Sequence, residues 1–353
     1  MSSSPSIARL SVGEAIELLR EADLLDLGRR ADAAARHLHP EPWRTYAIDR
    51  NINFTNVCEC RCRFCAFWRD AADPQAYVLS DEALDQKIGE AVALGATHIL
   101  AQGGLHAGLG LEFYERMLGR IRRRFPVALH CFSPPEVVDL ACREGLPVDR
   151  ILERLRAAGL DSLPGGGAEI LVDRVRRAVS PRKCTADEWL GVMRAAHRMG
   201  MRTTATMVFG HVETLEERVE HLARLRDLQD ETGGFLSFIA WPFQAPNTDL
   251  ARRGGLPDGW RPTSGAEYLR MLAVARLFLD NIPNVQASYV TMGLKISQAA
   301  LCFGANDLGS TMIEENVVAA AGCVHRASPE TLRRLIGEAG FAPRQRDSRY
   351  RLV

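Results

Sequence analysis

Short apolar runs alternate with longer amphipathic segments along most of the chain, and this alternation constrains the fold more than any other feature. Strand, helix and strand in succession are typical of a parallel βαβ unit. Eight strand-like runs lie at 46–53, 97–102, 127–132, 162–164, 202–209, 235–241, 285–290 and 301–303. Helix-like segments lie at 80–94, 111–124, 135–144, 148–158, 185–199, 215–232, 265–281 and 314–321. The pattern predicts an α/β fold, a closed (β/α)8 TIM-type barrel. A partial barrel of about six units is the alternative, because the fourth and eighth runs are the weakest.

The two ends of the chain lie outside this alternation. Residues from about 7 to 39 have apolar positions at helical spacing, and Pro40 and Pro42 end that helix. We therefore expect an N-terminal helical segment over 1–45, the barrel over 46–325, and a C-terminal helix and tail over 326–353.

Composition excludes several classes of protein. Lys+Arg and Asp+Glu both number 44, so the net charge of zero does not favour a nucleic-acid partner. No apolar run approaches the length of a membrane span, and the start Met-Ser-Ser-Ser-Pro-Ser does not resemble a signal peptide. We expect a cytoplasmic protein that binds neither nucleic acid nor membrane. In that compartment, nine cysteines are more typical of thiols or metal ligands than of disulfides.

Four cysteines lie within eight residues after the first predicted strand: Cys58, Cys60, Cys62 and Cys65. Cys58, Cys62 and Cys65 form C-x3-C-x2-C, and soft thiolates at this spacing favour an iron–sulfur cluster or zinc. A cubane cluster normally takes four cysteines, so a triplet leaves one iron open to a small molecule. A zinc knuckle is the alternative, although the chain has no second cysteine pair at zinc spacing.

Glycine and polar residues gather after the other predicted strands, at 102–106, 133–136, 164–169, 210–213, 241–247, 291–293 and 304–311. In a parallel barrel, the loops at the carboxyl ends of the strands carry the chemistry. Because these loops share one predicted face with the cysteine loop, we expect a single site there.

The cysteine triplet, with Phe64 before its last cysteine, resembles the signature of radical S-adenosylmethionine (SAM) enzymes. Gly103-Gly104 resembles the glycine motif of that superfamily. Four longer runs, at 49–58, 164–170, 209–214 and 304–312, resemble the cyclic dehypoxanthinyl futalosine synthase family, which serves the futalosine route to menaquinone. The likeness extends from about residue 46 to the end. The run 309–317 is more similar to this family than to its sister, aminodeoxyfutalosine synthase.

The resemblance implies a radical SAM cyclase with a [4Fe-4S] cluster and S-adenosyl-L-methionine as cofactors. A low-potential electron donor such as flavodoxin or ferredoxin would reduce the cluster, which would cleave SAM to a 5′-deoxyadenosyl radical. The radical would remove hydrogen from C4′ of dehypoxanthine futalosine, and the resulting sugar radical would add to the benzoate ring. Loss of one electron and one proton would then give cyclic dehypoxanthine futalosine. The protein would orient and shield these species.

The resemblance also implies roles for individual residues. Cys58, Cys62 and Cys65 would bind the cluster, and Cys60, which the usual motif lacks, is a bystander that could compete as a ligand or oxidise. Phe64 would pack on the adenine of SAM, or it is a core aromatic residue.

Four further residues are cofactor-binding candidates. Gly103 and Gly104 would present backbone to SAM, or they form a plain turn. Ser133 would bond to SAM, or it caps the next helix. Glu169 would hold ribose hydroxyls of SAM or substrate, or it is an acid at a helix N-terminus.

The last step needs a proton acceptor. His211, with Glu213 nearby, follows the fifth predicted strand, and histidine accepts protons at neutral pH. His106, Glu136 and Asp307 are rivals, and a structural role for His211 is at least as well supported. Among three arginines at 174, 176 and 177, one could hold the substrate carboxylate, although a solvated helix face explains at least two of them.

Several alternatives remain open on sequence grounds. A non-enzymatic iron–sulfur or zinc protein would need a fully liganded metal and would not cleave SAM. Within the superfamily, aminodeoxyfutalosine synthase, a deazaflavin-forming synthase and biotin synthase are alternatives. The last of these needs additional barrel ligands for a second cluster, and Cys131 alone does not supply a full set.

Overall fold

The computed structural model describes residues 9–353, which are built around a ten-stranded parallel sheet. The strands are β1 (Trp43–Ala47), β2 (Asp49–Asn53), β3 (His98–Gln102), β4 (Ala128–Cys131), β5 (Ser162–Leu163), β6 (Arg202–Phe209), β7 (Phe235–Pro242), β8 (Asn284–Gln286), β9 (Asp307–Ser310) and β10 (Ala342–Gln345). Their order is β10-β1-β9-β8-β7-β6-β5-β4-β3-β2. Every neighbouring pair is parallel.

The sheet curls back on itself. Only Ile48 separates β1 from β2, yet β1 pairs with β9 and β10 whereas β2 pairs with β3. One bent stretch of chain therefore joins β2, at one end of the sheet order, to β1, which is second from the other end. The chain after β9 runs beside this stretch, because the N–H of Ile313 donates to the carbonyl oxygen of Asp49 at 3.2 Å. The predicted TIM-type fold class is confirmed, as a curled half-barrel and not as the closed ring that the sequence predicted, because the order of the ten strands does not close.

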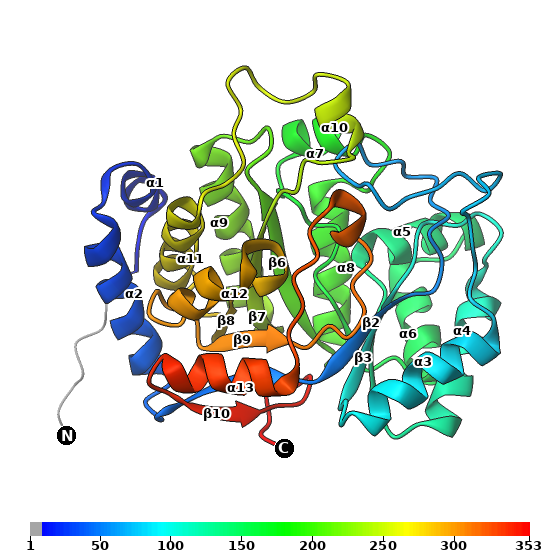
Figure 1. Cartoon of the computed structure of the whole chain (residues 1–353). Helices are drawn as coiled ribbons and strands as arrows, with labels where there is room; N and C mark the ends of the chain where they lie inside the picture. Colours follow the sequence, from blue (N-terminus) through cyan, green and yellow to red (C-terminus); the bar gives the residue numbers. More distant parts are fainter. Residues whose placement is uncertain (1–8) are drawn as a thin grey trace.

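Helices lie between and around the strands (Figure 1). They are α1 (Val12–Glu21), α2 (Leu24–Leu38), α3 (Asp81–Ala93), α4 (Leu111–Arg124), α5 (Pro134–Glu144), α6 (Val148–Ala158), α7 (Asp173–Val179), α8 (Ala186–Arg198), α9 (Leu215–Thr232), α10 (Asp249–Arg252), α11 (Gly265–Phe278), α12 (Tyr289–Ala300) and α13 (Pro329–Glu338). Side chains fix their starts: Thr185 and Thr214 both form capping boxes with the glutamate three residues on. Their apolar faces pack against the strands; Trp189 of α8, for example, is fully buried.

Both ends of the described chain pack on the barrel. In Figure 1, α1 and α2 lie against α11 on one side of the molecule, and α2 contributes the fully buried Leu27 and Ala31 to the core. At the C-terminal end, β10 extends the sheet beside β1. Within residues 9–353, no helix has the length and apolar character needed to cross a membrane.

The first six predicted strands lie close to their expected positions, but two elements in the last third are wrong. The run 301–303 is a turn after α12, and the eighth barrel strand is β9 instead. Gly304 follows that turn with φ of +97°, a conformation that favours glycine and turns the chain into β9. The predicted helix 314–321 is reduced to a 3-10 turn at Ala319–Ala321. The Glu315 carboxylate accepts hydrogen bonds from the backbone N–H groups of Val317, Val318 and Ala319, so these groups do not form helical hydrogen bonds.

The predicted N-terminal helix is two helices. The Asp23 side chain accepts hydrogen bonds from the N–H groups of Leu25 and Asp26, and this cap starts α2 afresh. The first two residues of the predicted helix, 7 and 8, lie outside the described residues.

Candidate active site

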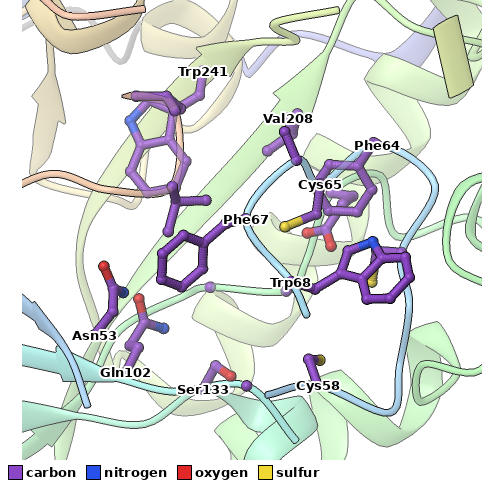
Figure 2. A pocket seen from close by; sticks show the side chains of 18 of the residues that line it. Asn53, Cys58, Phe64, Cys65, Phe67, Trp68, Gln102, Ser133, Val208 and Trp241 are labelled. Carbon is purple, nitrogen blue, oxygen red and sulfur yellow. The ribbon is translucent and has the colours of Figure 1, made fainter. Parts of the chain in front are cut away.

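A cavity of about 280 Å3 opens at the carboxyl ends of the strands. Eight predicted site residues line it together: Cys58, Cys62, Cys65, Phe64, Gly103, Gly104, Ser133 and Glu169. They come from the loops after β2, β3, β4 and β5. In Figure 2, Cys58, Phe64, Cys65 and Trp68 lie on one side of the cavity, whereas Asn53, Gln102 and Trp241 lie on the other. The predicted gathering of these loops therefore appears as one hollow with a cysteine side and a polar, aromatic side.

Backbone hydrogen bonds tie the cysteine loop to its neighbours. The N–H of Cys58 donates to the carbonyl oxygen of Arg69 at 3.1 Å, and the N–H of Leu105 donates to Cys58 Sγ at 3.3 Å. The N–H of Arg63 donates to the carbonyl oxygen of Val179 in α7 at 2.8 Å. The loop is thus fixed from both the β3 side and the α7 side.

The donor set fits an iron–sulfur cluster. Cys58, Cys62 and Cys65 are free thiols on one cavity wall. Within residues 9–353, no three His, Cys, Asp or Glu side chains are grouped to hold a single metal ion. The three thiolates of a cubane cluster do not have to point at one atom, because each binds a different iron atom. Cys60 is buried, with its Sγ 3.5 Å from that of Cys62, and this contact between the two thiols lowers the pKa of Cys62.

The glycine pair is pressed against the cysteine loop. A Cβ on Gly104 would lie 2.1 Å from the carbonyl oxygen of Val57 and 2.7 Å from Cys58 Cβ, so only glycine fits there. The N–H of Gly103 donates to the Glu136 carboxylate at 3.0 Å. Ser133 Oγ donates to the other oxygen of Glu136 at 2.6 Å. Ser133 and Glu136, which both line the cavity, therefore hold the glycine pair in place.

Glu169 meets a cation that the sequence analysis missed. Its carboxylate pairs with Lys183 Nζ, and both side chains are buried. Lys183 Nζ also lies 5.0 Å from the centroid of the Phe64 ring. Burial alone would lower the pKa of Lys183, but the negative charges of Cys62 and Glu169 outweigh it and hold the pKa well above its usual value. One signal was available: only three of the 44 Lys and Arg residues are lysine, so a lysine in this chain is an exception.

The two residues proposed around the last proton transfer do not line the cavity. His211 and Glu213 have fully buried side chains. His211 Nε2 lies 3.0 Å from the carbonyl oxygen of Val208, and Nδ1 lies 2.9 Å from the Glu213 carboxylate. Burial alone would raise the pKa of Glu213, but His211 and Arg218 hold it far below its usual value. These contacts give the pair a structural role at the end of β6.

Asp307, the third catalytic candidate, also lies away from the cavity-lining residues. It belongs to β9 and forms a buried ion pair with Arg346, with 2.5 Å between Arg346 Nε and Asp307 Oδ2. Thr45 Oγ1 donates to the same carboxylate at 2.5 Å. These bonds hold β1, β9 and the segment after β10 together.

The three arginines considered for a carboxylate clamp do not line the cavity either. Arg176 is buried and donates to the carbonyl oxygens of Gly167 and Ala168, so it supports the glycine loop before Glu169. Arg174 pairs with Glu217 on the surface, and Arg177 is exposed. Lys183 is the one Lys or Arg residue among the described residues that line the cavity.

Comparisons with known proteins show the family and the fold of the chain. A family model described as the Radical SAM superfamily matches residues 52–225, and one described as the CofH/MqnC C-terminal region matches residues 232–353. The fold resembles methylornithine synthase (PylB), with a TM-score of 0.75 and 17% identity over 96% of this chain and 95% of that one. It also resembles the FeFe-hydrogenase maturase HydG from Carboxydothermus hydrogenoformans, with a TM-score of 0.76 and 16% identity over 97% of this chain and 78% of that one. These two structures support the fold alone.

Sequence relatives are much closer. The chain is 44% identical to cyclic dehypoxanthine futalosine synthase of Halalkalibacterium halodurans, over 98% of this chain and 92% of that protein. It is 42% identical to the protein of that name from Streptomyces coelicolor, over 97% and 85%. It is also 44% identical to 5-amino-6-(D-ribitylamino)uracil--L-tyrosine 4-hydroxyphenyl transferase of Methanopyrus kandleri, over 88% and 84%. With the cysteine triplet on the wall of a barrel cavity, these matches show that the chain is a radical SAM enzyme and belongs to the family that contains the cyclic dehypoxanthine futalosine synthases.

Proposed function

We propose that this enzyme converts dehypoxanthine futalosine to cyclic dehypoxanthine futalosine in menaquinone biosynthesis. The observation that carries the proposal is the 44% identity to the Halalkalibacterium halodurans cyclase, which extends over nearly the whole length of both chains. The cavity supports it, because the eight predicted cluster and cofactor residues line one hollow.

Cys58, Cys62 and Cys65 would hold the [4Fe-4S] cluster, and the open iron would face SAM. The backbone at Gly103 and Gly104, with Ser133 beside it, would bind the methionine part of SAM. Phe64 would pack on the adenine, and Glu169 would bind ribose hydroxyls while Lys183 fixes its carboxylate. When bound there, the cluster and SAM supply the 5′-deoxyadenosyl radical that removes hydrogen from the substrate.

The apolar part of the cavity lining would shield the substrate radical. Phe67, Val208 and Trp241 contribute apolar and aromatic surface to this lining, and Figure 2 shows Phe67 between the cysteine side and Trp241. A wall of this kind excludes water and offers few polar groups for a reactive carbon to attack.

We assign the final proton acceptor to a carboxyl group that lines the cavity. His211, Glu213 and Asp307 do not line it. The carboxyl groups in that position are Glu136, Glu169 and Glu315. We also propose that a low-potential flavodoxin or ferredoxin supplies the electron in the cytoplasm.

The rival function is the coupling of L-tyrosine to 5-amino-6-(D-ribitylamino)uracil, after which other relatives are named. Those relatives share about the same identity with this protein over less of the chain. The test is anaerobic reconstitution with iron and sulfide, followed by SAM, dithionite and dehypoxanthine futalosine. The proposal expects 5′-deoxyadenosine together with a product lighter than the substrate by two hydrogen atoms. Deoxyadenosine without this product, and a coupled product from L-tyrosine and 5-amino-6-(D-ribitylamino)uracil, would favour the rival instead.

A further inference from the structure

Asn51, at the cavity wall, carries a polar atom without a hydrogen-bond partner among the described residues. It lies on β2, is only 5% exposed and lines the cavity. Its Oδ1 atom is buried and has no hydrogen-bond partner among residues 9–353. Buried polar atoms in native proteins are almost always paired, so an unpaired one on a residue that lines a cavity indicates a missing ligand group.

Two more carboxamides lie next to it. Asn53 is two residues further along β2, so its side chain projects from the same face of the strand as Asn51. Gln102 of β3 is the direct cross-strand partner of Asn53, and both line the cavity. Figure 2 shows Asn53 and Gln102 together on the side of the cavity away from Cys58 and Cys65.

Local contacts hold these two amides in place. Asn53 Oδ1 accepts a hydrogen bond from Asn316 Nδ2 at 3.3 Å, and Gln102 Nε2 lies 3.4 Å from the carbonyl oxygen of Phe132. A Cβ on Gly166 would lie 2.5 Å from Gln102 Nε2. The Gln102 amide therefore fits there because residue 166 has no side chain.

The chemistry of this amide cluster (Asn51, Asn53 and Gln102) suits a neutral ligand with several hydroxyl groups. Carboxamides both donate and accept hydrogen bonds and carry no charge. Lys183, the one cation lining the described cavity, pairs with Glu169 on the wall that carries the cysteine loop. An anionic group would therefore find no counter-charge at the amide cluster, whereas a hydroxyl group would supply the donor that Asn51 Oδ1 lacks.

We propose that the amide cluster is the subsite for the hydroxyl groups of a ribose-derived chain, with Asn51 Oδ1 accepting a hydrogen bond from one of them. Resting on the proposed function, this subsite takes the ribose of dehypoxanthine futalosine. The same chemistry would suit the ribityl chain in the name of the Methanopyrus kandleri relative's activity. Asn51 is thus a specificity-determining residue that holds the sugar opposite the cysteines.

The test compares Asn51→Leu with the wild type, both anaerobically reconstituted. Leucine keeps the branching of asparagine at Cγ and has no hydrogen-bonding group. We expect Asn51→Leu to weaken dehypoxanthine futalosine binding about tenfold or more, because a site built to bind a hydroxyl group discriminates strongly when that bond is lost. Single-deoxy analogues of the substrate ribose give an independent arm. One of them should bind the wild type about tenfold more weakly than the parent, yet bind Asn51→Leu no more weakly than the parent does.

Stability separates this role from a structural one. Because Asn51 Oδ1 has no partner in the described structure, Asn51→Leu should unfold at the wild-type temperature or above it. Asn306 is the matched control, a buried asparagine whose amide bonds to Asn284, Arg276 and the N–H of Val285. Asn306→Leu should unfold at a lower temperature.

The outcomes distinguish the two proposals. If the wild type cyclises dehypoxanthine futalosine and neither Asn51→Leu nor any deoxy analogue binds more weakly, the subsite is wrong and the proposed function stands. If the wild type binds only 5-amino-6-(D-ribitylamino)uracil, and does so through Asn51, the subsite stands and the proposed function is wrong. If it binds neither compound, both are wrong.

Discussion

Glu136 accepts a hydrogen bond from the backbone N–H of Gly103, with 3.0 Å between Oε1 and the nitrogen. The carboxyl group is buried on the cavity wall, and Ser133 Oγ donates to its second oxygen at 2.6 Å. Burial raises the pKa of Glu136 to about 8, against the opposing effect of these hydrogen bonds. A buried carboxyl group with a raised pKa therefore positions the glycine pair beside the cysteine loop.

Replacing Glu136 by glutamine should change how stability depends on pH. The pKa of Glu136 is about 8 in the folded protein, against 4.5 for an unperturbed glutamate. Between these values the folded state binds a proton that the unfolded state has lost. The free energy of unfolding of the wild type should therefore fall by about 1.4 kcal/mol per pH unit through this group. Glu136→Gln removes the titration and keeps both hydrogen bonds, since the glutamine amide accepts from Gly103 and donates to Ser133.

Urea unfolding of both proteins at pH 5, 6, 7 and 8, in the same metal state, measures this effect. The Glu136→Gln protein should gain stability relative to the wild type as the pH rises. If the two stabilities run parallel over this range, the carboxyl group ionises at its ordinary pKa.

Gly104→Ala should prevent the cysteine loop from holding iron. The added Cβ would lie 2.1 Å from the carbonyl oxygen of Val57, which is backbone and has little freedom to move aside. We expect a loss of stability of about 1–3 kcal/mol from overpacking, and the loss of most of the iron after reconstitution. Iron and sulfide content per chain is the measurement. Gly191→Ala is the control, because no atom lies within 4 Å of its Cβ and alanine favours helix α8 by about 1 kcal/mol. Full iron content in Gly104→Ala would contradict the proposed close contact.

Local patterns in the sequence predicted which loops meet on the cysteine side of the cavity. Cys58, Cys62 and Cys65 are close in sequence, and Gly103 and Ser133 each follow a buried strand at the expected end of the barrel. The position of a loop follows from strand periodicity alone. Periodicity does not say which way a side chain turns after the strand ends. His211 follows β6 as expected, yet its ring turns into the protein toward Glu213 and the carbonyl oxygen of Val208.

Contacts between distant segments could not be predicted in this way. Lys183 follows the unpredicted helix α7 and meets Glu169 only after the chain folds back. The prediction for the C-terminal part of the barrel was wrong for a related reason. Leu301 and Phe303 are apolar because they pack against the core just after α12, and β9 lies in a Gly- and Asp-rich segment with weak strand propensity. Its pairing with β1, and the Asp307–Arg346 ion pair, define that strand.

The Lys183–Glu169 pair should be separable into a contribution to stability and a contribution to SAM binding. Lys183→Met leaves the Glu169 carboxylate buried without its partner, and breaking a buried ion pair costs about 3–5 kcal/mol. The double variant Lys183→Met/Glu169→Gln removes both charges and should recover most of that stability. Both variants should bind SAM more weakly than the wild type, because the carboxylate is absent or no longer held in place. Chemical unfolding and SAM titration of the reconstituted proteins measure the two effects. Wild-type SAM affinity in the double variant would exclude this pair from the SAM site.

His211→Gln should lower stability without changing the amount of cyclised product formed per SAM cleaved. The His211 side chain is fully buried and contacts Val208 from behind the cavity lining, and its loss leaves Glu213 with fewer partners. We expect the free energy of unfolding to fall by about 1–3 kcal/mol. The amount of cyclised product per 5′-deoxyadenosine should equal that of the wild type at a temperature where both proteins are folded. Trp241→Ala is the contrast, because it opens the apolar wall of the cavity and should yield more deoxyadenosine per product. If His211→Gln instead forms deoxyadenosine without product, as loss of the final base requires, then the histidine reaches the substrate in the working enzyme and its structural assignment is wrong.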